Sequence, residues 1–446
     1  MLIQYMEYNV KKYHVITYGC QMNIHESEKI SGILNERGYT YTNDKKKADI
    51  IVFNTCCIRD NAEKKVEGNI GALKSLKKAN KNLIVAVGGC MTQQKGAAER
   101  LYNKFPFIDI IFGTHNLESF SQLLDQKIKQ KKCLISILDK ETEIVEGTPK
   151  FRTSYPNAWV NITYGCNNFC TYCIVPYVRG RERSRNISDI INECKQLVSE
   201  GYKEITLLGQ NVNSYGNDLE NVNFSDLLKQ INQIDGNFRL RFMTNHPKDL
   251  TEELIKTISQ CEKVCKSVHL PIQSGSNHVL KLMNRKYTRE QYLEKIDLLR
   301  KYIPDIAITT DIMVGFPQET EQDFIDTMDI VEKVKFSGAF TFIYSKRKGT
   351  PAEKMDGQID EITSKERIIK LINLQNSINR NFSVEYKNKV VEILCEGYDD
   401  KKNMYLGRDT YGRMAYFSSE NDLIGKFVKV KITKTGGISL IGELVL

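Results

Sequence analysis

The sequence predicts an α/β protein of three successive parts: a parallel sheet flanked by helices, a partial barrel of six β/α units, and a small antiparallel β-barrel. Residues 10–128 and residues 152–382 both alternate short apolar runs with amphipathic helical patterns, which is typical of parallel sheets. Residues 385–446 contain strand-like runs separated by Gly, Asp and Asn turns, which is typical of an all-β domain. We take these three ranges as the predicted domains.

The composition is that of a globular protein from a reducing compartment. The chain has 446 residues, enough for about two to four domains. Hydrophobic residues make up 41%, which excludes wholesale disorder, and the net charge of +9 is compatible with an anionic partner. No apolar run is long enough to cross a bilayer, and the N-terminus lacks the apolar core of a secretory signal. We therefore expect a cytoplasmic protein without a membrane partner, whose twelve cysteines are thiolate ligands or buried thiols.

The first part is expected to form a small parallel sheet with three cysteines at one edge. Its apolar runs lie at 13–17, 49–53, 83–87 and 107–111, and its helical patterns near 27–37, 62–78 and 95–104. Three of the runs lead into Cys20, Cys56 and Cys90. One such cysteine alone is more often a core residue, but three at equivalent strand ends favour a three-thiolate metal site, because parallel strands end at the same edge. We expect Cys57 to point away from this site.

Residues 123–150 are expected to form a charged connector. They contain one strand-like run, at 133–138, and we assign them no chemistry.

The second part contains six strand-like runs, each followed by a polar or glycine-bearing loop. The runs lie at 160–163, 204–208, 239–243, 267–270, 306–314 and 340–344, with helical patterns at 188–200, 224–234, 251–259, 277–283, 289–302 and 321–333. Barrel sites lie at the carboxyl ends of strands, so these loops are expected to line a cavity. Gln210 and Gln273 are as well explained as turn caps as they are as cavity residues, and His246, before Pro247, is more often a turn residue.

A loop with three closely spaced cysteines follows the first of these strands. Cys166, Cys170 and Cys173 form the pattern CxxxCxxC on a loop rich in Gly and Asn, which is a poor composition for a core. Thiolates suit zinc and iron–sulfur clusters, but a closed zinc site needs four ligands and no fourth Cys or His follows closely. A cubane cluster held by three thiolates keeps one iron open for another molecule. The spacing therefore favours such a cluster.

Four alternating arginines follow the cysteine loop: Arg179, Arg181, Arg183 and Arg185. A charge run is usually a solvated face. Their position at the expected cavity mouth favours instead contacts with phosphate or with a cofactor carboxylate, and we select Arg183 as a cofactor-binding residue.

The last part reads as a five-stranded barrel reached through a charged helical pattern at 360–380. Its runs are 390–395, 404–408, 414–417, 426–434 and 440–445. Phe427, Val428, Val430 and Ile432 are expected to supply the core. The side chains that could face RNA are Lys426, Lys429, Lys431, Lys434, Arg408, Arg413 and Tyr416. Alternating lysines on a strand are also a common edge-protecting device, so this surface alone does not identify RNA binding.

The three-cysteine loop, with Tyr172 directly before its last cysteine, resembles the signature of radical S-adenosylmethionine enzymes. In that superfamily the open iron binds the amino and carboxylate groups of S-adenosylmethionine, and an electron cleaves its C–S bond to give a 5′-deoxyadenosyl radical. The resemblance implies that the central part is a partial (β/α)6 radical S-adenosylmethionine barrel, with Cys166, Cys170 and Cys173 as cluster ligands. From their positions around the expected cavity, we select Tyr172, Gln210, Gln273 and Arg183 as cofactor-binding residues.

The whole chain, from about residue 10 to its end, resembles the methylthiotransferase family. The motifs at 18–23, 54–59, 173–180 and 209–216 are similar to those of the MiaB branch, which makes 2-methylthio-N6-isopentenyladenosine beside the tRNA anticodon. The resemblance implies a flavodoxin-like N-terminal domain whose Cys20, Cys56 and Cys90 hold an auxiliary cluster, and a C-terminal TRAM domain that binds RNA. It implies two 4Fe-4S clusters, with S-adenosylmethionine as both radical source and methyl donor.

Radical chemistry suits this substrate because carbon 2 of adenine carries an unactivated C–H bond. No side-chain acid or base is expected to act there, since acid–base catalysis needs pKa values near the working pH. The implied partners are the anticodon stem-loop of tRNA and a reductase or flavodoxin-type electron donor, with the sulfur donor left open and the chain a monomer. The alternatives are a sibling enzyme acting on threonylcarbamoyladenosine or on a ribosomal-protein aspartate, and a non-catalytic RNA-binding iron–sulfur sensor.

Overall fold

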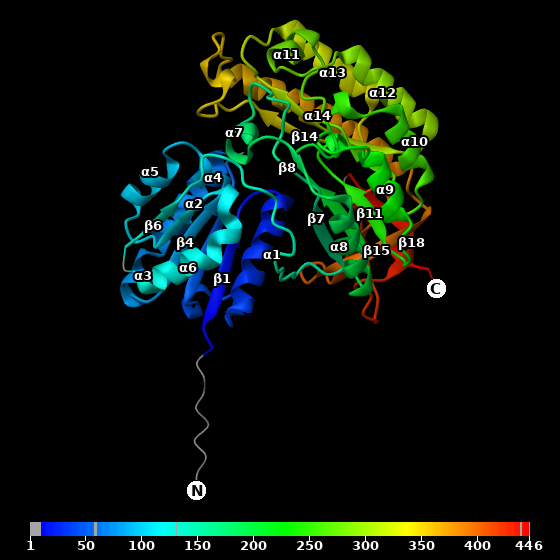
Figure 1. Cartoon of the computed structure of the whole chain (residues 1–446). Helices are drawn as coiled ribbons and strands as arrows, with labels where there is room; N and C mark the ends of the chain where they lie inside the picture. Colours follow the sequence, from blue (N-terminus) through cyan, green and yellow to red (C-terminus); the bar gives the residue numbers. More distant parts are fainter. Residues whose placement is uncertain (1–9, 58–59, 131, 438, 446) are drawn as a thin grey trace. The chain divides into compact units, whose positions relative to one another are not determined.

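The chain folds into two units, each built around parallel β-strands. The structure is a computed structural model that describes residues 10–57, 60–130, 132–437 and 439–445, without the side chains of residues 60–62 (Figure 1). The first unit comprises Met1–Thr153 and Ile174–Arg181, and the second comprises Ser154–Cys173 and Glu182–Leu446. The predicted motif at 54–59 ends on Ile58 and Arg59, which lie outside the described residues.

The first unit is a six-stranded parallel sheet with the strand order β2-β1-β3-β4-β5-β6. The strands are β1 (Lys12–Thr17), β2 (Thr40–Tyr41), β3 (Ile50–Thr55), β4 (Ile84–Gly89), β5 (Ile110–Phe112) and β6 (Leu134–Ser136). The helices are α1 (Gln21–Glu36), α2 (Asp60–Ala72), α3 (Lys74–Ala79), α4 (Cys90–Gln93), α5 (Ala97–Lys104), α6 (Phe120–Lys129) and α7 (Val175–Arg179), with 3-10 turns η1 (Lys45–Lys47) and η2 (Thr114–Ser119).

Both faces of this sheet are covered by helices. On β3, Ile50 and Val52 join a core cluster with α1 and α6, whereas Ile51 and Phe53 join another with α2, α4 and α5. A strand buried on both faces reads as a continuous apolar run, which is why residues 50–53 carry no polar alternation. The sheet confirms the predicted N-terminal parallel fold.

The segment expected to be a connector adds to this sheet. Residues 134–136 pair in parallel with β5 as the edge strand β6, and residues 120–129 form the helix α6. Leu123 and Leu124 of α6 are buried against the sheet. The strand-like run predicted at 133–138 is thus the strand β6, whereas the helix α6 was missed because the charges on its solvent side resemble those of a connector.

The second unit begins with six parallel strands that form an open barrel. These strands are β7 (Asn157–Asn161), β10 (Glu204–Leu208), β11 (Arg239–Phe242), β12 (Ser267–His269), β13 (Ala307–Val314) and β14 (Gly338–Ile343). They form two three-stranded sheets, β7-β10-β11 and β12-β13-β14, and Leu240 of β11 bridges in parallel to Val264, just before β12. A short antiparallel pair, β8 (Thr163–Tyr164) with β9 (Arg183–Ser184), brackets the cysteine loop. The six β/α units confirm the predicted barrel.

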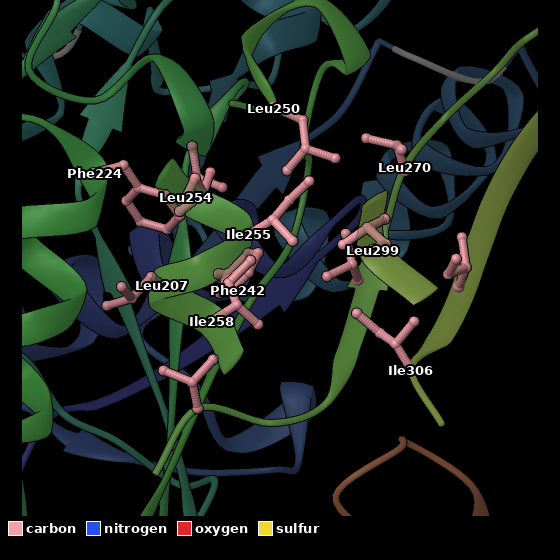
Figure 2. Close-up of a cluster of buried hydrophobic side chains, with 14 of the residues drawn as sticks. Leu207, Phe224, Phe242, Leu250, Leu254, Ile255, Ile258, Leu270, Leu299 and Ile306 are labelled. Carbon is pink, nitrogen blue, oxygen red and sulfur yellow. The ribbon is translucent and has the colours of Figure 1, made fainter. Parts of the chain in front are cut away.

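Helices cover the outside of the barrel strands. They are α8 (Ile187–Ser199), α9 (Phe224–Asn232), α10 (Glu252–Gln260), α11 (Asn277–Leu282), α12 (Arg289–Tyr302) and α13 (Glu321–Val334), with 3-10 turns η3 (Val212–Ser214), η4 (Pro247–Asp249) and η5 (Pro351–Lys354). Figure 2 shows side chains of this core, in which Leu254, Ile255 and Ile258 of α10 lie close to Leu207 and Phe242 of the strands. This packing fixes the strands, so the loops at their carboxyl ends start from rigid positions.

The chain ends in a closed five-stranded barrel reached through the long helix α14 (Glu361–Val384). Its strands are β15 (Val390–Asp399), β16 (Met404–Arg408), β17 (Met414–Phe417), β18 (Phe427–Gly436) and β19 (Ser439–Leu444), in the order β15-β16-β17-β19-β18. All pairs are antiparallel except β17 with β19. Val430 and Ile432 are buried as expected, but Phe427 lies outside the barrel core, with its ring 4.9 Å from the Arg239 guanidinium.

Among the helices of the described residues, none combines the length and the apolar character needed to span a membrane.

Candidate metal and cofactor sites

The loop with Cys166, Cys170 and Cys173 follows the first barrel strand, as predicted. Left-handed backbone at Gly165 (φ 77°) and Phe169 (φ 48°) turns the chain tightly around the three cysteines. The Cys173 amide donates to the Cys170 carbonyl over 2.9 Å, which closes the second half of the loop. Cys166 and Cys170 are buried and Cys173 is half-buried. The three thiols therefore sit on one short, ordered loop.

The end of α11 holds this loop in place. The Thr171 hydroxyl donates to the Leu282 carbonyl (2.9 Å), and its amide donates to the Met283 carbonyl (3.1 Å). The Asn284 side chain donates to the Phe169 carbonyl over 2.9 Å. These contacts come from more than 100 residues further along the chain, so no local sequence pattern predicts them.

Arg285 is a site residue that sequence reasoning missed. Its guanidinium donates to the Cys170 sulfur (3.4 Å), the Pro271 carbonyl (2.9 Å) and the Tyr287 hydroxyl (3.0 Å). It is buried, and within the described chain no carboxylate forms an ion pair with it. A buried cation beside a cysteine stabilises the thiolate form that a metal ligand needs.

Burial opposes ionisation of the neighbouring thiol. It raises the pKa of Cys166 to about 11. A bound iron ion would therefore displace the proton of this thiol.

Buried polar atoms without a partner in the described chain gather at the carboxyl ends of the first three barrel strands. They belong to Asn161, Thr163, Asn213, Asn245 and His246. Asn161 is fully buried, yet neither atom of its amide has a partner in the described residues. An unpaired buried polar atom costs free energy, and native structures usually satisfy it with a ligand or water. These atoms fit a polar ligand bound beside the cysteine loop.

His246 is a turn residue through one ring nitrogen and leaves the other ring nitrogen unpaired beside the strand ends. Its Nδ1 accepts from the Lys248 amide over 3.3 Å, which is the expected turn role, while its Nε2 is one of the unpaired atoms. Burial, followed by the positive charges of Arg285 and Lys248, lowers its pKa far below the ordinary value. The ring is therefore neutral.

Gln210 and Gln273 both lie at carboxyl ends of barrel strands. Gln210 directly follows Gly209 after β10. Gln273 has left-handed backbone (φ 72°) and forms a parallel bridge to β13, because its amide donates to the Asp311 carbonyl and its carbonyl accepts from the Met313 amide. Both positions belong to the predicted cavity rim, and their binding of a cofactor stays a prediction.

Tyr172 and Arg183 flank the cysteine loop. The Tyr172 ring meets Phe316 edge-on at 6.4 Å and is part of a small apolar cluster. Arg183 lies on β9, opposite Tyr164 of β8. Tyr172 therefore has a packing role whether or not it also contacts a cofactor.

The neighbouring arginines do not behave as a group. The buried Arg185 donates to the Asn161 carbonyl (2.7 Å) and to the Glu193 carboxylate (2.9 Å). Arg179, in the first unit, pairs with Glu26 through both of its terminal nitrogens (2.6 and 3.2 Å). Our expectation that the run contacts phosphate or a cofactor carboxylate is therefore wrong for these two, because each already pairs with an internal carboxylate.

Glu182 is a second residue that sequence reasoning missed. It is buried, and its amide donates to the Asn167 side chain in the cysteine loop over 3.3 Å. Burial raises its pKa to about 7, with Asp249 and Asp218 adding to the effect. Its carboxyl group is thus close to half-protonated at neutral pH.

In the first unit, Cys20, Cys56 and Cys90 lie at the ends of three neighbouring strands. Cys20 caps α1 after β1, Cys56 follows β3, and Cys90 opens α4 after β4. The strand order places β3 between β1 and β4, with Thr17 opposite Asn54 and Thr55 opposite Gly89. The register thus brings the three cysteines to one sheet edge, as predicted.

Close backbone packing shapes this edge. A Cβ on Gly19 (φ 127°) would lie 2.7 Å from the Cys56 Cβ, and one on Gly89 (φ 105°) would lie 2.4 Å from the Thr55 carbonyl oxygen. Both positions therefore require glycine.

Two buried asparagines fix the same edge. The Asn23 amide donates to Asn54 Oδ1 (3.2 Å), and the Asn54 amide donates to the Asn23 carbonyl (2.7 Å). Asn23 Oδ1 in turn accepts from the Cys20 thiol over 3.5 Å. This network links the start of α1 to the end of β3.

Cys57 does not point away from this edge, so that expectation is wrong. It is buried, and its thiol hydrogen-bonds the Cys90 sulfur. This hydrogen bond, together with the charge of Arg179, lowers the pKa of Cys90 to about 7 despite burial. Consecutive residues of an extended chain point to opposite faces, but the chain leaves β3 at Thr55, so strand alternation no longer applies at Cys57.

In the described part of the chain, no three His, Cys, Asp or Glu side chains converge closely enough to hold a single metal ion. A cubane cluster binds each cysteine at a different iron, so its ligands stand further apart than those of one ion. Three thiols on one loop and three at one sheet edge fit such clusters chemically.

The C-terminal barrel presents a row of exposed lysines on and next to β18. They are Lys426, Lys429, Lys431 and Lys434. Arg408 and Arg413 do not belong to this surface, because Arg408 pairs with Glu396 (2.9 Å) and Arg413 lies 4.9 Å from the Tyr386 ring. Of the basic residues expected to face RNA, only the lysines therefore remain as candidate RNA contacts.

Comparison with known families gives three matches along the chain. Residues 160–331 match the Radical SAM superfamily, residues 12–113 match the uncharacterized protein family UPF0004, and residues 384–445 match the TRAM domain. A protein of Clostridium tetani named tRNA-2-methylthio-N(6)-dimethylallyladenosine synthase is 54% identical over 433 residues, covering 97% of this chain and 96% of that protein. One of the same name from Alkaliphilus oremlandii is 53% identical, covering 98% and 93%.

The chain belongs to the tRNA-2-methylthio-N(6)-dimethylallyladenosine synthase family. This confirms the methylthiotransferase resemblance seen in the sequence. Membership of the radical S-adenosylmethionine superfamily means an enzyme that uses a 4Fe-4S cluster and S-adenosylmethionine.

Solved structures agree with this synthase fold. The radical S-adenosylmethionine methyltransferase TsrM from Kitasatospora setae, solved with cobalamin and a [4Fe-4S] cluster, aligns with a TM-score of 0.57 at 13% identity, covering 77% of each chain. The cobalamin-dependent enzyme OxsB aligns with a TM-score of 0.53 at 14% identity, covering 83% of this chain and 56% of that one. At such low identity these likenesses support the fold alone.

Proposed function

We propose that this chain adds a methylthio group to carbon 2 of N6-isopentenyladenosine at position 37 of tRNA, next to the anticodon. The observation that carries the proposal is the pair of cysteine trios, each at the carboxyl ends of parallel strands, in a synthase-family chain. Two thiolate sites suit a reaction that must both activate a C–H bond and deliver sulfur.

Cys166, Cys170 and Cys173 are the proposed ligands of the radical-generating cluster. That cluster, together with S-adenosylmethionine, would supply the radical that removes hydrogen from carbon 2. The chain's own part is to bind and orient: Arg285 holds Cys170, and Gln210 and Gln273 take polar groups of the cofactor together with the unpaired atoms at the strand ends. Tyr172 and Arg183 complete the proposed cofactor surroundings.

Cys20, Cys56 and Cys90 are the proposed ligands of a second 4Fe-4S cluster, whose open iron presents sulfur. S-adenosylmethionine is also the proposed methyl donor. The strand register and the Asn23–Asn54 network hold the three cysteine positions rigidly, which suits a site that must keep one corner open.

The exposed lysines of the C-terminal barrel are the proposed contacts to the tRNA backbone. Four positive side chains in one row would bind phosphates without reading sequence, and the substrate base in the anticodon loop is already single-stranded and so is easily splayed out. We propose 10–128, 152–382 and 385–446 as the domain division, with the edge strand β6 (Leu134–Ser136) added to the first domain. We also propose a monomer in the cytoplasm and a reductase or flavodoxin-type electron donor.

Anaerobic reconstitution tests the proposal directly. The protein is reconstituted with iron and sulfide, both are counted, and the product is assayed with isopentenylated tRNA by nucleoside analysis. We expect about eight irons, as two 4Fe-4S clusters require, and 2-methylthio-N6-isopentenyladenosine as product. A product only with threonylcarbamoyladenosine tRNA or with a ribosomal-protein aspartate would indicate the sibling activities, and no cleavage of S-adenosylmethionine would indicate a sensor.

A further inference from the structure

A buried ion pair lies at the sheet edge that carries Cys20, Cys56 and Cys90, and neither partner is a ligand. Arg179 and Glu26 meet through two hydrogen bonds of 2.6 and 3.2 Å, and both residues are buried. Burying two charges costs free energy that their mutual attraction often does not recover, so such a pair is weak evidence of a stabilising role. Its position relative to the thiols suggests a chemical role instead.

The segment that carries Arg179 is held firmly within the first unit. Ile174 and Val178 pack against Cys57 and Cys90 in one apolar cluster, and α7 contacts α4 and η2. The Thr114 hydroxyl donates to the Val178 carbonyl over 2.6 Å, and the Arg181 amide donates to Glu141 over 3.3 Å. The Arg179 side chain therefore has a fixed place at this edge.

Arg179 is within reach of the thiols themselves. It hydrogen-bonds the Cys90 sulfur, and its charge also acts on Cys20. The nearby carboxyl groups are Glu26, which acts on Cys90, and Glu63, which acts on Cys57 and accepts from the Gln94 amide (2.8 Å). The positive charge of Arg179 therefore acts on two of the three cysteines at this edge.

We infer that Arg179 and Glu26 set the reduction potential of the auxiliary cluster, acting with opposite sign through their charges. This inference rests on the proposed second cluster at Cys20, Cys56 and Cys90. Reduction adds one electron and no proton, so the cluster gains one negative charge. A nearby guanidinium favours that added charge and raises the potential, whereas a nearby carboxylate disfavours it and lowers the potential.

The opposite signs separate this role from a merely structural one. Arg179→Gln and Glu26→Gln break the same ion pair, so any loss of packing or of ligand placement is common to both. Their charge effects oppose each other: loss of the cation should lower the potential, and loss of the carboxylate should raise it. The double variant Glu26→Gln/Arg179→Gln removes both charges and should return towards the parent.

The experiment uses the full-length chain with Cys166, Cys170 and Cys173 changed to Ala, so that only the auxiliary cluster remains. Each variant is reconstituted anaerobically, its iron and sulfide are counted, and dithionite titration followed by electron paramagnetic resonance gives the midpoint potential. We expect at least a tenfold change in the reduction equilibrium for each single variant, which is about 59 mV for one electron. Arg179→Lys, which keeps the charge, should stay close to the parent.

The controls distinguish a failure of the proposed second cluster from a failure of the inference about Arg179 and Glu26. Arg367→Gln removes a buried arginine of the second unit that pairs with Glu319 over 2.7 Å, and it should leave the potential unchanged. If the parent with intact Arg179 binds no cluster, the proposed second cluster fails. If the cluster forms but Arg179→Gln and Glu26→Gln shift the potential in the same direction, or by less than tenfold, the inference alone is overturned. If Arg179→Gln binds no cluster, its potential cannot be measured. In that case, a Glu26→Gln variant whose midpoint potential is not higher than that of the parent would overturn the inference.

Discussion

The two cysteine trios differ in how the chain builds them and in the charge placed beside them. Cys166, Cys170 and Cys173 lie on one tight loop, whereas Cys20, Cys56 and Cys90 come from the ends of three strands. Each trio has a buried arginine that hydrogen-bonds one cysteine. Arg285 is held by a carbonyl and a phenol, while Arg179 is paired with the carboxylate of Glu26.

The difference indicates two electrostatic settings in one chain. Beside the loop, Arg285 donates to a carbonyl, a phenol and a sulfur, and no carboxylate of the described residues forms an ion pair with it. At the sheet edge the arginine and its carboxylate largely cancel. A site whose open iron binds the carboxylate of a cofactor would gain from net positive charge, whereas at the sheet edge the two paired charges would act with opposite sign on the proposed second cluster.

Removing one ligand from each trio should give the largest and most distinct effects. Cys166→Ala should abolish 5′-deoxyadenosine formation, because a cluster with two ligands does not hold S-adenosylmethionine in place. Cys20→Ala should keep some cleavage but lose sulfur insertion. Both are measured by chromatography of anaerobic reactions. Normal thiolation by the Cys20 variant would remove the distinction between the trios.

Substitutions at the adjacent Cys56 and Cys57 test which of the two is the third ligand beside Cys20 and Cys90. We expect Cys56→Ala to lose the auxiliary cluster, about half of the bound iron, since Cys56 directly continues β3 towards the shared edge. Cys57→Ala should keep it. Iron and sulfide analysis decides between them, and the reverse outcome would make Cys57, which contacts Cys90, the third ligand.

Arg285→Gln tests the uncompensated charge beside the loop. We expect a loss of about 2 kcal/mol in the free energy of unfolding, because the Pro271 carbonyl and the Cys170 sulfur lose a charged donor. Cleavage of S-adenosylmethionine should fall as well. Urea unfolding and product analysis measure the two effects, and Arg285→Lys should restore cleavage in part. Full activity in the Gln variant would show that the charge is not needed.

The stability of the ligand-free protein should fall as pH rises from about 4.5 to about 7, in part because of Glu182. Folded Glu182 keeps its proton up to about pH 7, whereas the unfolded chain releases it near the ordinary value of 4.5. The folded state therefore binds more protons in this window and loses stability as pH rises.

Glu182→Gln should remove about 3 kcal/mol of this pH dependence, since each unit of pKa difference is worth about 1.4 kcal/mol. Urea midpoints at pH 4.5 and pH 7.5 give the comparison. An unchanged slope in the Gln variant would mean that Glu182 is ionised beside the loop and would weaken the contrast between the two trios.

The smallest effect is expected at a surface that belongs to neither trio. Lys429→Glu and Lys431→Glu should each weaken tRNA binding several-fold and lower the salt slope of log Kd by about 1, without changing cleavage of S-adenosylmethionine. Lys333→Glu on α13, whose lysine pairs with Asp329 (2.8 Å), serves as the control. Equal losses in the control would mean that only the net charge of the chain matters.

Much of the fold was determined by the sequence through local patterns. Strand and helix ranges of the barrel follow from apolar periodicity, and β10 (Glu204–Leu208) and α12 (Arg289–Tyr302) begin and end where the pattern predicts. The grouping of Cys166, Cys170 and Cys173 could be predicted from their spacing alone, because all three lie on one loop. The grouping of Cys20, Cys56 and Cys90 required one further rule, that neighbouring parallel strands end at the same edge of a sheet.

Only the tertiary structure decided which polar neighbours surround the cysteines. Arg285 lies 115 residues from Cys170, and Arg179 lies 153 residues from Glu26. The orientation of Cys57 and the place of β6 in the sheet were likewise beyond reach. Periodicity reports which face of an element is buried, but the partner of a single charged side chain depends on packing between distant segments. No local pattern encodes that choice.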